Sequence, residues 1–133
     1  MGTVDYSLAI ETDRGFDEVL QATRDALAAE GFGVLTEIDV KATMKAKLDV
    51  DRDEYLILGA CNPPLAHKAL EAEPELGVLL PCNVVVYRTG GKTRVSAVAA
   101  EQMLGMVGND DLAPVATEVA QRLDRVLAAV AAA

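Results

Sequence analysis

The chain has 133 residues, of which 51% are hydrophobic and 25% charged, and its formal net charge at pH 7 is −9. This length and balance predict one domain, residues 1–133, whose core forms without disulfides. The acidic charge argues against nucleic acid and anionic membranes as partners, because phosphate binding needs a dense basic patch. No run approaches the ~20 apolar residues of a membrane span and the N-terminus carries no leader pattern, so we expect a cytoplasmic protein.

The first part of the chain predicts two strands and two helices in alternation. Residues 4–10 alternate apolar and polar side chains, as in a strand with one face on a core. A helix follows from Phe16 and ends at Gly31, since glycine is the usual left-handed cap. Residues 33–38 predict a second strand, and Asp39 is a plausible N-cap for a short basic helix.

The second part predicts three strands and two further helices. Residues 55–60 form a continuous apolar run, typical of a strand buried on both faces. Asn62 is a good N-cap and Pro63 suits the first helical position, so a helix begins there. Residues 82–88 and 93–98 are valine-rich strands joined by a turn with two glycines, and a helix with an apolar stripe runs from residue 112 onward.

The element order β-α-β-α-β-α-β-β-α predicts a two-layer α+β fold. We expect a mixed five-stranded sheet with helices packed mostly on one face, because a hairpin is combined with helical connections. The last helix should pack on the sheet, although its long apolar stripe would also suit a contact between two copies of the chain.

The stretch from residue 56 to residue 67 is the most informative, since a strand ends at Cys61 and a helix begins at once. Free backbone N–H groups at a helix N-terminus favour anions, so we expect an accessible thiolate at Cys61. A second Cys-Asn dipeptide begins at Cys82. In a reducing compartment the two cysteines are free thiols, and the chain length between them allows them either to meet or to lie at opposite ends of the sheet.

Several side chains are candidate ligands for a metal or for haem. They are Cys61, His67 and Cys82, with Met103 or Met106 as a further donor. Thiolate, imidazole and thioether groups favour soft ions such as Cu(I), or zinc where thiolates dominate, and they also serve as axial ligands of haem. The helical wheel places His67 beside Glu71, which either pairs with an exposed imidazole or orients a ligand imidazole. A buried packing role is the alternative for each cysteine, and it fits Cys82 better than Cys61, which lies beside the helix N-terminus.

Three sequence blocks resemble the domain of unknown function 302 family. They are residues 31–39, 57–67 and 79–87, and the most specific part is Gly-Ala-Cys-Asn-Pro-Pro at residues 59–64. The resemblance implies a small cytoplasmic α+β domain that forms a homodimer and has no established activity. The hallmark positions of the family fall on Cys61, Asn62, Pro63, His67 and Cys82.

These observations leave three interpretations open. The first is a small binding module with a Cys/His-lined pocket for a soft metal or haem, to which Asn62, Pro63 and Glu37 also contribute. The second is a thiol-dependent redox protein or enzyme, with Cys61 as the thiolate and Cys82 as the resolving thiol. The third is a dimeric interaction protein whose cysteines are structural.

Overall fold

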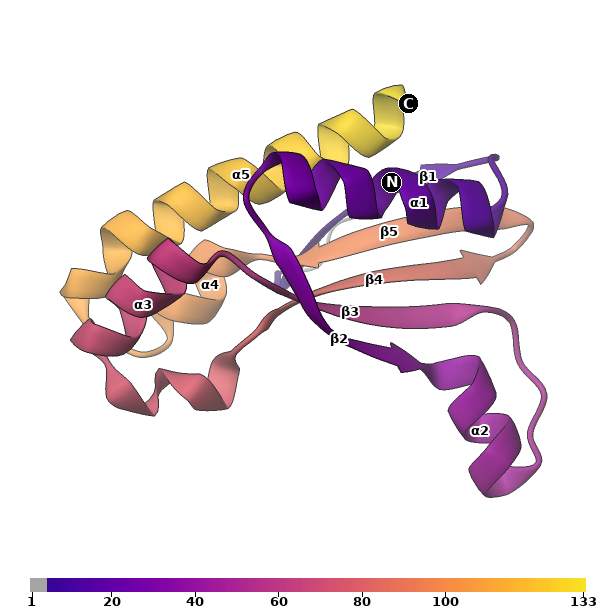
Figure 1. Ribbon diagram of the computed structural model, residues 1–133, viewed down its shortest axis with the longest axis horizontal. Coiled ribbons are helices and arrows are strands. Elements are labelled where there is room, and N and C mark those ends of the chain that lie inside the picture. Colours follow the sequence, from indigo (N-terminus) through magenta and orange to yellow (C-terminus); the bar gives the residue numbers. More distant parts are fainter. Residues whose placement is uncertain (1–4) are drawn as a thin grey trace.

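The computed structural model describes residues 5–133. Five strands form one sheet, and Figure 1 shows the helices packed against it. In chain order the elements are β1 (Ser7–Thr12), α1 (Phe16–Ala29), β2 (Gly33–Asp39), α2 (Val40–Leu48), β3 (Tyr55–Cys61), α3 (Pro63–Ala72), the 3-10 helix η1 (Pro74–Leu79), β4 (Cys82–Thr89), β5 (Lys92–Val98), α4 (Ala100–Gly105), the 3-10 helix η2 (Asp110–Leu112) and α5 (Ala113–Ala132). The predicted α+β class and element order are confirmed. Val4, where the first strand was expected to begin, lies outside the described residues.

The sheet has the strand order β1-β5-β4-β3-β2 and is antiparallel throughout. The expectation of a mixed sheet is therefore wrong. Parallel neighbours need a crossover connection, but the one helix that could supply it, α1, carries the chain from one edge strand, β1, to the opposite edge strand, β2. The other helical connections join neighbouring strands that run in opposite directions. The glycine turn between β4 and β5 is confirmed, with φ values of 56° at Gly90 and 80° at Gly91.

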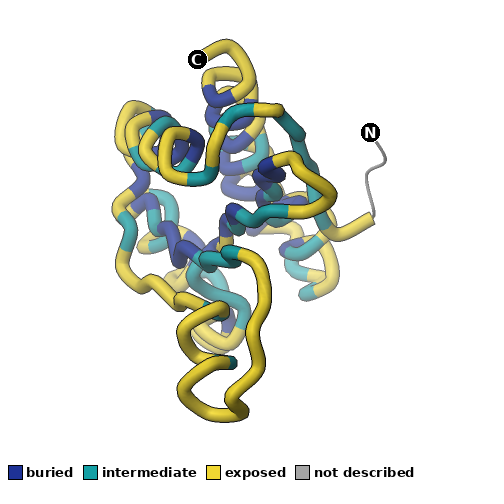
Figure 2. The backbone as a smooth tube through the Cα atoms, turned by 90° about the vertical axis from the view of Figure 1, so that its right-hand side faces the viewer, coloured by how far each residue is buried: buried dark blue, intermediate teal, exposed yellow. Residues whose placement is uncertain are grey.

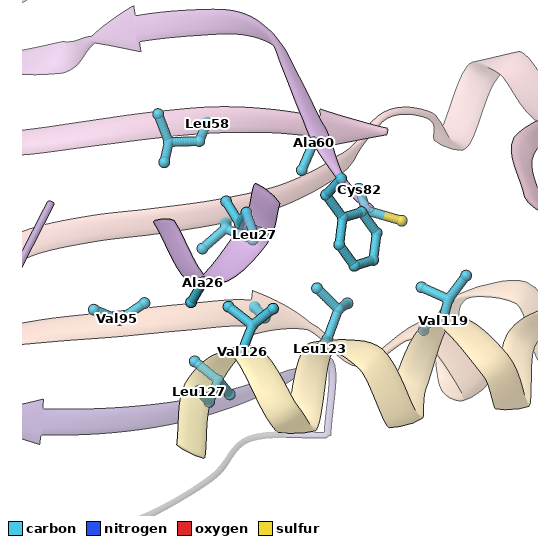
Figure 3. Packing of buried hydrophobic residues seen from close by; sticks show 14 of the residues in the cluster. Ala26, Leu27, Leu58, Ala60, Cys82, Val95, Val119, Leu123, Val126 and Leu127 are labelled. Carbon is cyan, nitrogen blue, oxygen red and sulfur yellow. The ribbon is translucent and has the colours of Figure 1, made fainter. Parts of the chain in front are cut away.

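The core lies between the sheet and the helices α1 and α5, which run side by side over one face (Figures 1 and 3). Its fully buried side chains come from both layers and include Val19, Leu27, Leu58, Val84, Val86, Val95, Leu123, Val126 and Val130. The apolar stripe of α5 is thus buried inside its own chain. This burial confirms that α5 packs on the sheet and removes the stripe as a contact surface for a second copy.

The helix α2 is the most exposed helix of the fold. It extends away from the sheet in Figure 1, and Figure 2 shows the chain around it as almost continuously exposed. None of its residues is buried. No helix among the described residues is long and apolar enough to cross a membrane.

Candidate functional site

The two cysteines lie at the same end of the sheet. Cys61 ends β3 and Cys82 begins β4, and these strands are antiparallel neighbours with Ala60 paired to Cys82. A connection between antiparallel neighbours leaves and re-enters the sheet at the same end, so α3 and η1 return the chain to the end of the sheet at which β3 stops. The structure therefore places the two cysteines on neighbouring strands at the same end of the sheet, but the pairing of Ala60 with Cys82 directs their side chains to opposite faces. Cys82 is buried and Cys61 is partly exposed.

A cavity of about 310 Å³ lies at this end of the sheet, between the strand ends and the helices α3, α4 and α5. Both cysteines, Asn62 and Met103 line it together with apolar side chains that include Phe32, Leu65, Ala69, Leu76, Leu104 and Val119. In Figure 3 the sulfur of Cys82 points away from the core residues Leu58 and Leu27. The volume falls at the lower end of the ~300–1,000 Å³ typical of small-molecule sites.

Asn62 is buried and both ends of its side-chain amide are already bonded. Its Oδ1 accepts a hydrogen bond from the backbone N–H of Leu65 at 3.3 Å, which is the predicted N-cap of α3. Its Nδ2 donates to the backbone carbonyl of Glu30 at 3.4 Å, where α1 ends. Asn62 thus joins the end of α1 to the start of α3.

The first turn of α3 has no free N–H group. Proline occupies its first two positions, residues 63 and 64, and supplies none. The N–H of Leu65 is bonded to the Asn62 side chain, and the N–H of Ala66 donates to the Asn62 carbonyl at 2.9 Å. The expectation that free N–H groups stabilise a Cys61 thiolate is therefore wrong, and the signal was in the sequence, since two consecutive prolines remove two donors.

The Cys82 thiol is held in its neutral form. Burial raises the pKa of Cys82 to about 11, and the neighbouring Cys61 acts in the same direction. At neutral pH Cys82 is therefore protonated, which makes it a weak nucleophile. The electrostatic influence of Cys61 on Cys82 agrees with their placement at one end of the cavity.

His67 lies outside the cavity. Its side chain is 75% exposed, and its Nε2 lies 2.7 Å from Oε1 of Glu71, so the polar flank predicted from the helical wheel is confirmed. Within residues 5–133 no group of three or more His, Cys, Asp or Glu side chains is placed to hold a metal ion. The expected ligand set of Cys61, His67 and Cys82 is therefore not assembled.

Two other candidates also lie away from the cavity lining. Glu37 forms an ion pair with Arg24 of α1 at the edge of the sheet, and Pro63 is an exposed residue that starts α3. Of the two methionine candidates, Met103 lines the cavity, whereas Met106 is 72% exposed. The apolar lining from α4 and α5 carried no sequence signal, because residues of the same types form the core.

Comparison with known proteins identifies a family without an assigned activity. Residues 8–130 match the family described as domain of unknown function DUF302. The chain is also similar to the crystal structure of the uncharacterized conserved protein DUF302 from Bacillus stearothermophilus, with a TM-score of 0.87 and 28% sequence identity over 95% of this chain and 98% of that chain. No curated protein matches the sequence.

Proposed function

Since the chain belongs to the DUF302 family, whose name assigns no activity, we propose its function from the cavity itself: the protein binds a small, predominantly apolar molecule between α3 and the ends of β3 and β4. One observation carries this proposal. The cavity is lined by apolar side chains, and its only side-chain amide, Asn62, is bonded at both ends. A polar ligand would leave its own hydrogen bonds unmade there, and each such loss costs about 1–3 kcal/mol.

A ligand that fills the cavity gains free energy chiefly by leaving water. Burial of roughly 200 Å² of apolar ligand surface contributes about 5 kcal/mol at ~25 cal/mol per Å². A gain of about 5 kcal/mol corresponds to a dissociation constant of roughly 0.2 mM, and association costs reduce this gain, so we expect weak binding of about this strength or below.

The test is a titration with N-phenyl-1-naphthylamine, a neutral dye that fluoresces in apolar surroundings. The chain contains no tryptophan, so the dye signal has no indole background. We expect saturable binding of one dye per chain, which the variant Ala66→Phe abolishes by placing a ring in the cavity that Ala66 lines. Ala28→Phe on the exposed side of α1 is the matched control. Equal binding by both variants, or binding that does not saturate, would refute the proposal.

Haem is a more specific occupant that the sulfur side chains of the cavity allow. Haem needs apolar surroundings and an axial ligand, for which Cys61, Cys82 and Met103 are the available side chains. Addition of haemin, followed by its absorbance spectrum, tests this occupant. A spectrum identical for the wild type and Ala66→Phe would remove haem.

The thiol-dependent alternative has weaker support. An attacking thiolate at Cys61 would need stabilisation that the first turn of α3 does not supply, and the Cys82 thiol is neutral at pH 7. The favourable observation is that both thiols line one cavity. Rapid, selective alkylation of Cys61 at pH 7, faster than that of a free thiol, would restore this alternative.

Partner binding is a second candidate function, because large apolar side chains are exposed on and around α2. They are Leu35, Ile38, Leu48 and Val50, each at least 46% exposed. We propose that they form the contact of a homodimer. The helix α2 has no buried residue within its own chain, so a second copy would remove these apolar side chains from water.

Sedimentation equilibrium tests the homodimer. We expect the mass of a dimer for the wild type, and a shift towards monomer in Leu48→Ser. Val78→Ser is the control, since Val78 is 77% exposed but lies on η1. A monomer at all concentrations, or equal effects of the two variants, would refute the homodimer contact.

A further inference from the structure

The face of the sheet opposite α1 and α5 carries a second hollow, of about 470 Å³. Among the described residues, its lining comes from β1, β3, β4 and β5 and from Tyr6, and it shares no residue with the cavity beside α3. All three tyrosines of the chain line this hollow, although aromatic residues make up only 4% of the sequence. The tyrosines are therefore gathered at one place outside the core.

A row of paired residues crosses this face of the sheet. Arg94 of β5 lies opposite Glu11 of β1 on one side and opposite Tyr87 of β4 on the other. Tyr87 in turn lies opposite Tyr55 of β3. Opposed residues project to the same face, and successive residues of a strand project to opposite faces. Because Val95 lies in the core, its neighbour Arg94 and the rest of this row face away from the core.

The two tyrosines of the row form a stack that ends at the hollow. The ring centroids of Tyr55 and Tyr87 are 4.8 Å apart and their planes differ by 22°. Cζ of Arg52 lies 4.9 Å from the ring centroid of Tyr55, so Arg52 and Tyr87 cover the two faces of that ring. The strand order places β5 beyond β4, so the second face of Tyr87 is directed towards β5 and the hollow. Within residues 5–133 no further ring or cation packs on Tyr87.

The charges at the hollow favour a neutral ligand. Arg94 is the only charged side chain among the described residues that line it, and only 9% of this residue is exposed. Its Nη1 lies 3.4 Å from Oε2 of Glu11, whose charge balances that of the guanidinium. A cationic ligand would meet Arg94, and an anionic ligand would meet Glu11 together with the net charge of −9 of the chain. A neutral molecule meets neither repulsion.

The remaining lining favours a flat ring with a polar edge. Ser96 is two residues from Arg94 on the same face of β5, and within the described part of the chain its hydroxyl forms no hydrogen bond. Val85, opposite Ser96, and Val98 add apolar surface. A sugar carries hydroxyl groups on all sides, and those against the valines would stay unpaired, which is costly. A heteroaromatic ring has apolar faces and keeps its hydrogen-bonding groups at its edge, so it fits this mixture.

We propose that the hollow binds a neutral heteroaromatic molecule, which stacks on Tyr87 and places its polar edge over Ser96. Such a ring extends the stack of Tyr55 and Tyr87 by one member, at the spacing that neighbouring strands set. The site is separate from the apolar cavity of the proposed function, because the two have no lining residue in common.

The test is a titration of the wild type with caffeine, a neutral heteroaromatic probe, followed by proton NMR of the aromatic rings. We expect saturable shifts of the tyrosine signals. Phe16 and Phe32 are internal references, since neither lines the hollow, and Phe32 lines the apolar cavity. Shifts of Phe32 in place of the tyrosines, or no saturable shift up to the solubility limit of caffeine, would overturn the site. Glucose is the non-aromatic probe, and tyrosine shifts as large with glucose would overturn the choice of ligand.

Variants of the hollow test the stack and the polar edge. Tyr87→Leu should weaken caffeine binding by about 10-fold or more, because the stacking of a heteroaromatic ring on an aromatic side chain is lost. Tyr87→Phe keeps the ring and should lose far less. Ser96→Ala should weaken binding by about 2–10-fold, the effect of one hydrogen bond. Thr89→Ala is the control, since Thr89 is exposed on β4 and does not line the hollow.

The two sites are separated by comparing both probes on both variants. Tyr87→Leu should retain N-phenyl-1-naphthylamine and Ala66→Phe should retain caffeine, because each substitution changes the lining of only one site. Loss of caffeine in Ala66→Phe would assign caffeine to the apolar cavity and overturn the site. Equal losses in Tyr87→Leu and Tyr87→Phe would overturn the stack. Far-UV circular dichroism shows whether each variant is folded, and the titration of the wild type decides the question without any variant.

Discussion

Gly59 is a position where even one added methyl group has no room. It lies on β3 opposite Thr36 of β2, on the face of the sheet away from the core residues Leu58 and Ala60. A Cβ atom at this position would lie 2.1 Å from Oγ1 of Thr36 and 2.8 Å from Cγ of Pro81. Pro81 also lines the cavity and directly precedes Cys82. We therefore expect Gly59→Ala to destabilise the protein and disturb the cavity.

The two short contacts differ in how easily they can relax. The Thr36 hydroxyl can move by a change of rotamer, at a cost of about 0.5–1.5 kcal/mol. The ring of Pro81 has no comparable freedom, so it must shift together with the backbone, and overpacking of this kind costs about 1–3 kcal/mol. The lower chain entropy of unfolded alanine returns about 0.4–1 kcal/mol. The net expectation is a loss of about 2 kcal/mol in the free energy of unfolding, or roughly 8 °C in Tm.

Urea denaturation of four proteins tests this reasoning: the wild type, Gly59→Ala, Gly77→Ala, and Gly59→Ala combined with Thr36→Ala. Gly77 is the control, because a Cβ atom there meets nothing within 4 Å, and its variant should stay within about 0.5 kcal/mol of the wild type. The double variant should recover part of the loss, since only the contact with Pro81 remains. A Gly59→Ala protein as stable as the wild type would refute the close approach.

Three further predictions concern the helices and the buried thiol. Asn62→Ala should lower the free energy of unfolding by about 1 kcal/mol through loss of the N-cap. Asn62→Ser keeps an acceptor for the Leu65 N–H and should lose less. Urea denaturation measures both variants, and equal losses would contradict the capping role. Leu123→Ala should lower the free energy of unfolding by about 2–5 kcal/mol, because the side chain of Leu123 is fully buried. Gln121→Ala, on the exposed side of α5, should change the stability little. Equal melting temperatures of the two variants would contradict the burial of the apolar stripe. Cys82 should resist iodoacetamide at pH 8 and react faster as the pH rises towards 11. Because the pKa of Cys82 in the folded protein lies above the ordinary value of 9.0, the stability that this thiol contributes is complete below about pH 9 and is lost as the pH approaches 11. Fast labelling of the native protein at pH 8 would contradict the burial of Cys82.

The elements of the fold follow from local patterns in the sequence. The helix α1 extends from Phe16 as far as its apolar periodicity does, and Gly31 closes it with a φ of 83°. Asn62 caps α3, and two glycines make the turn between β4 and β5. Each of these features depends on residues within a few positions of one another, and for that reason the element order could be predicted. The family was indicated separately, by the resemblance of three sequence blocks, and is confirmed.

The candidate site was only partly predictable. Cys61, Asn62, Cys82 and Met103 were chosen from their residue types and do line one cavity. His67 was chosen with them, but helix geometry directs its side chain to solvent and to Glu71. Proximity in the sequence to Cys61 therefore did not give proximity at the site.

By itself, the sequence determined the order of the strands and of the longer helices, since capping, turns and apolar periodicity act over short distances along the chain. The tertiary structure alone decided the strand order, the antiparallel direction of every pair, and the placement of Cys61 and Cys82 at the same end of neighbouring strands. It also decided that α4 and α5 close a cavity over these cysteines. The physical reason is that these features arise from pairing and packing between residues far apart in the chain, which no local pattern encodes.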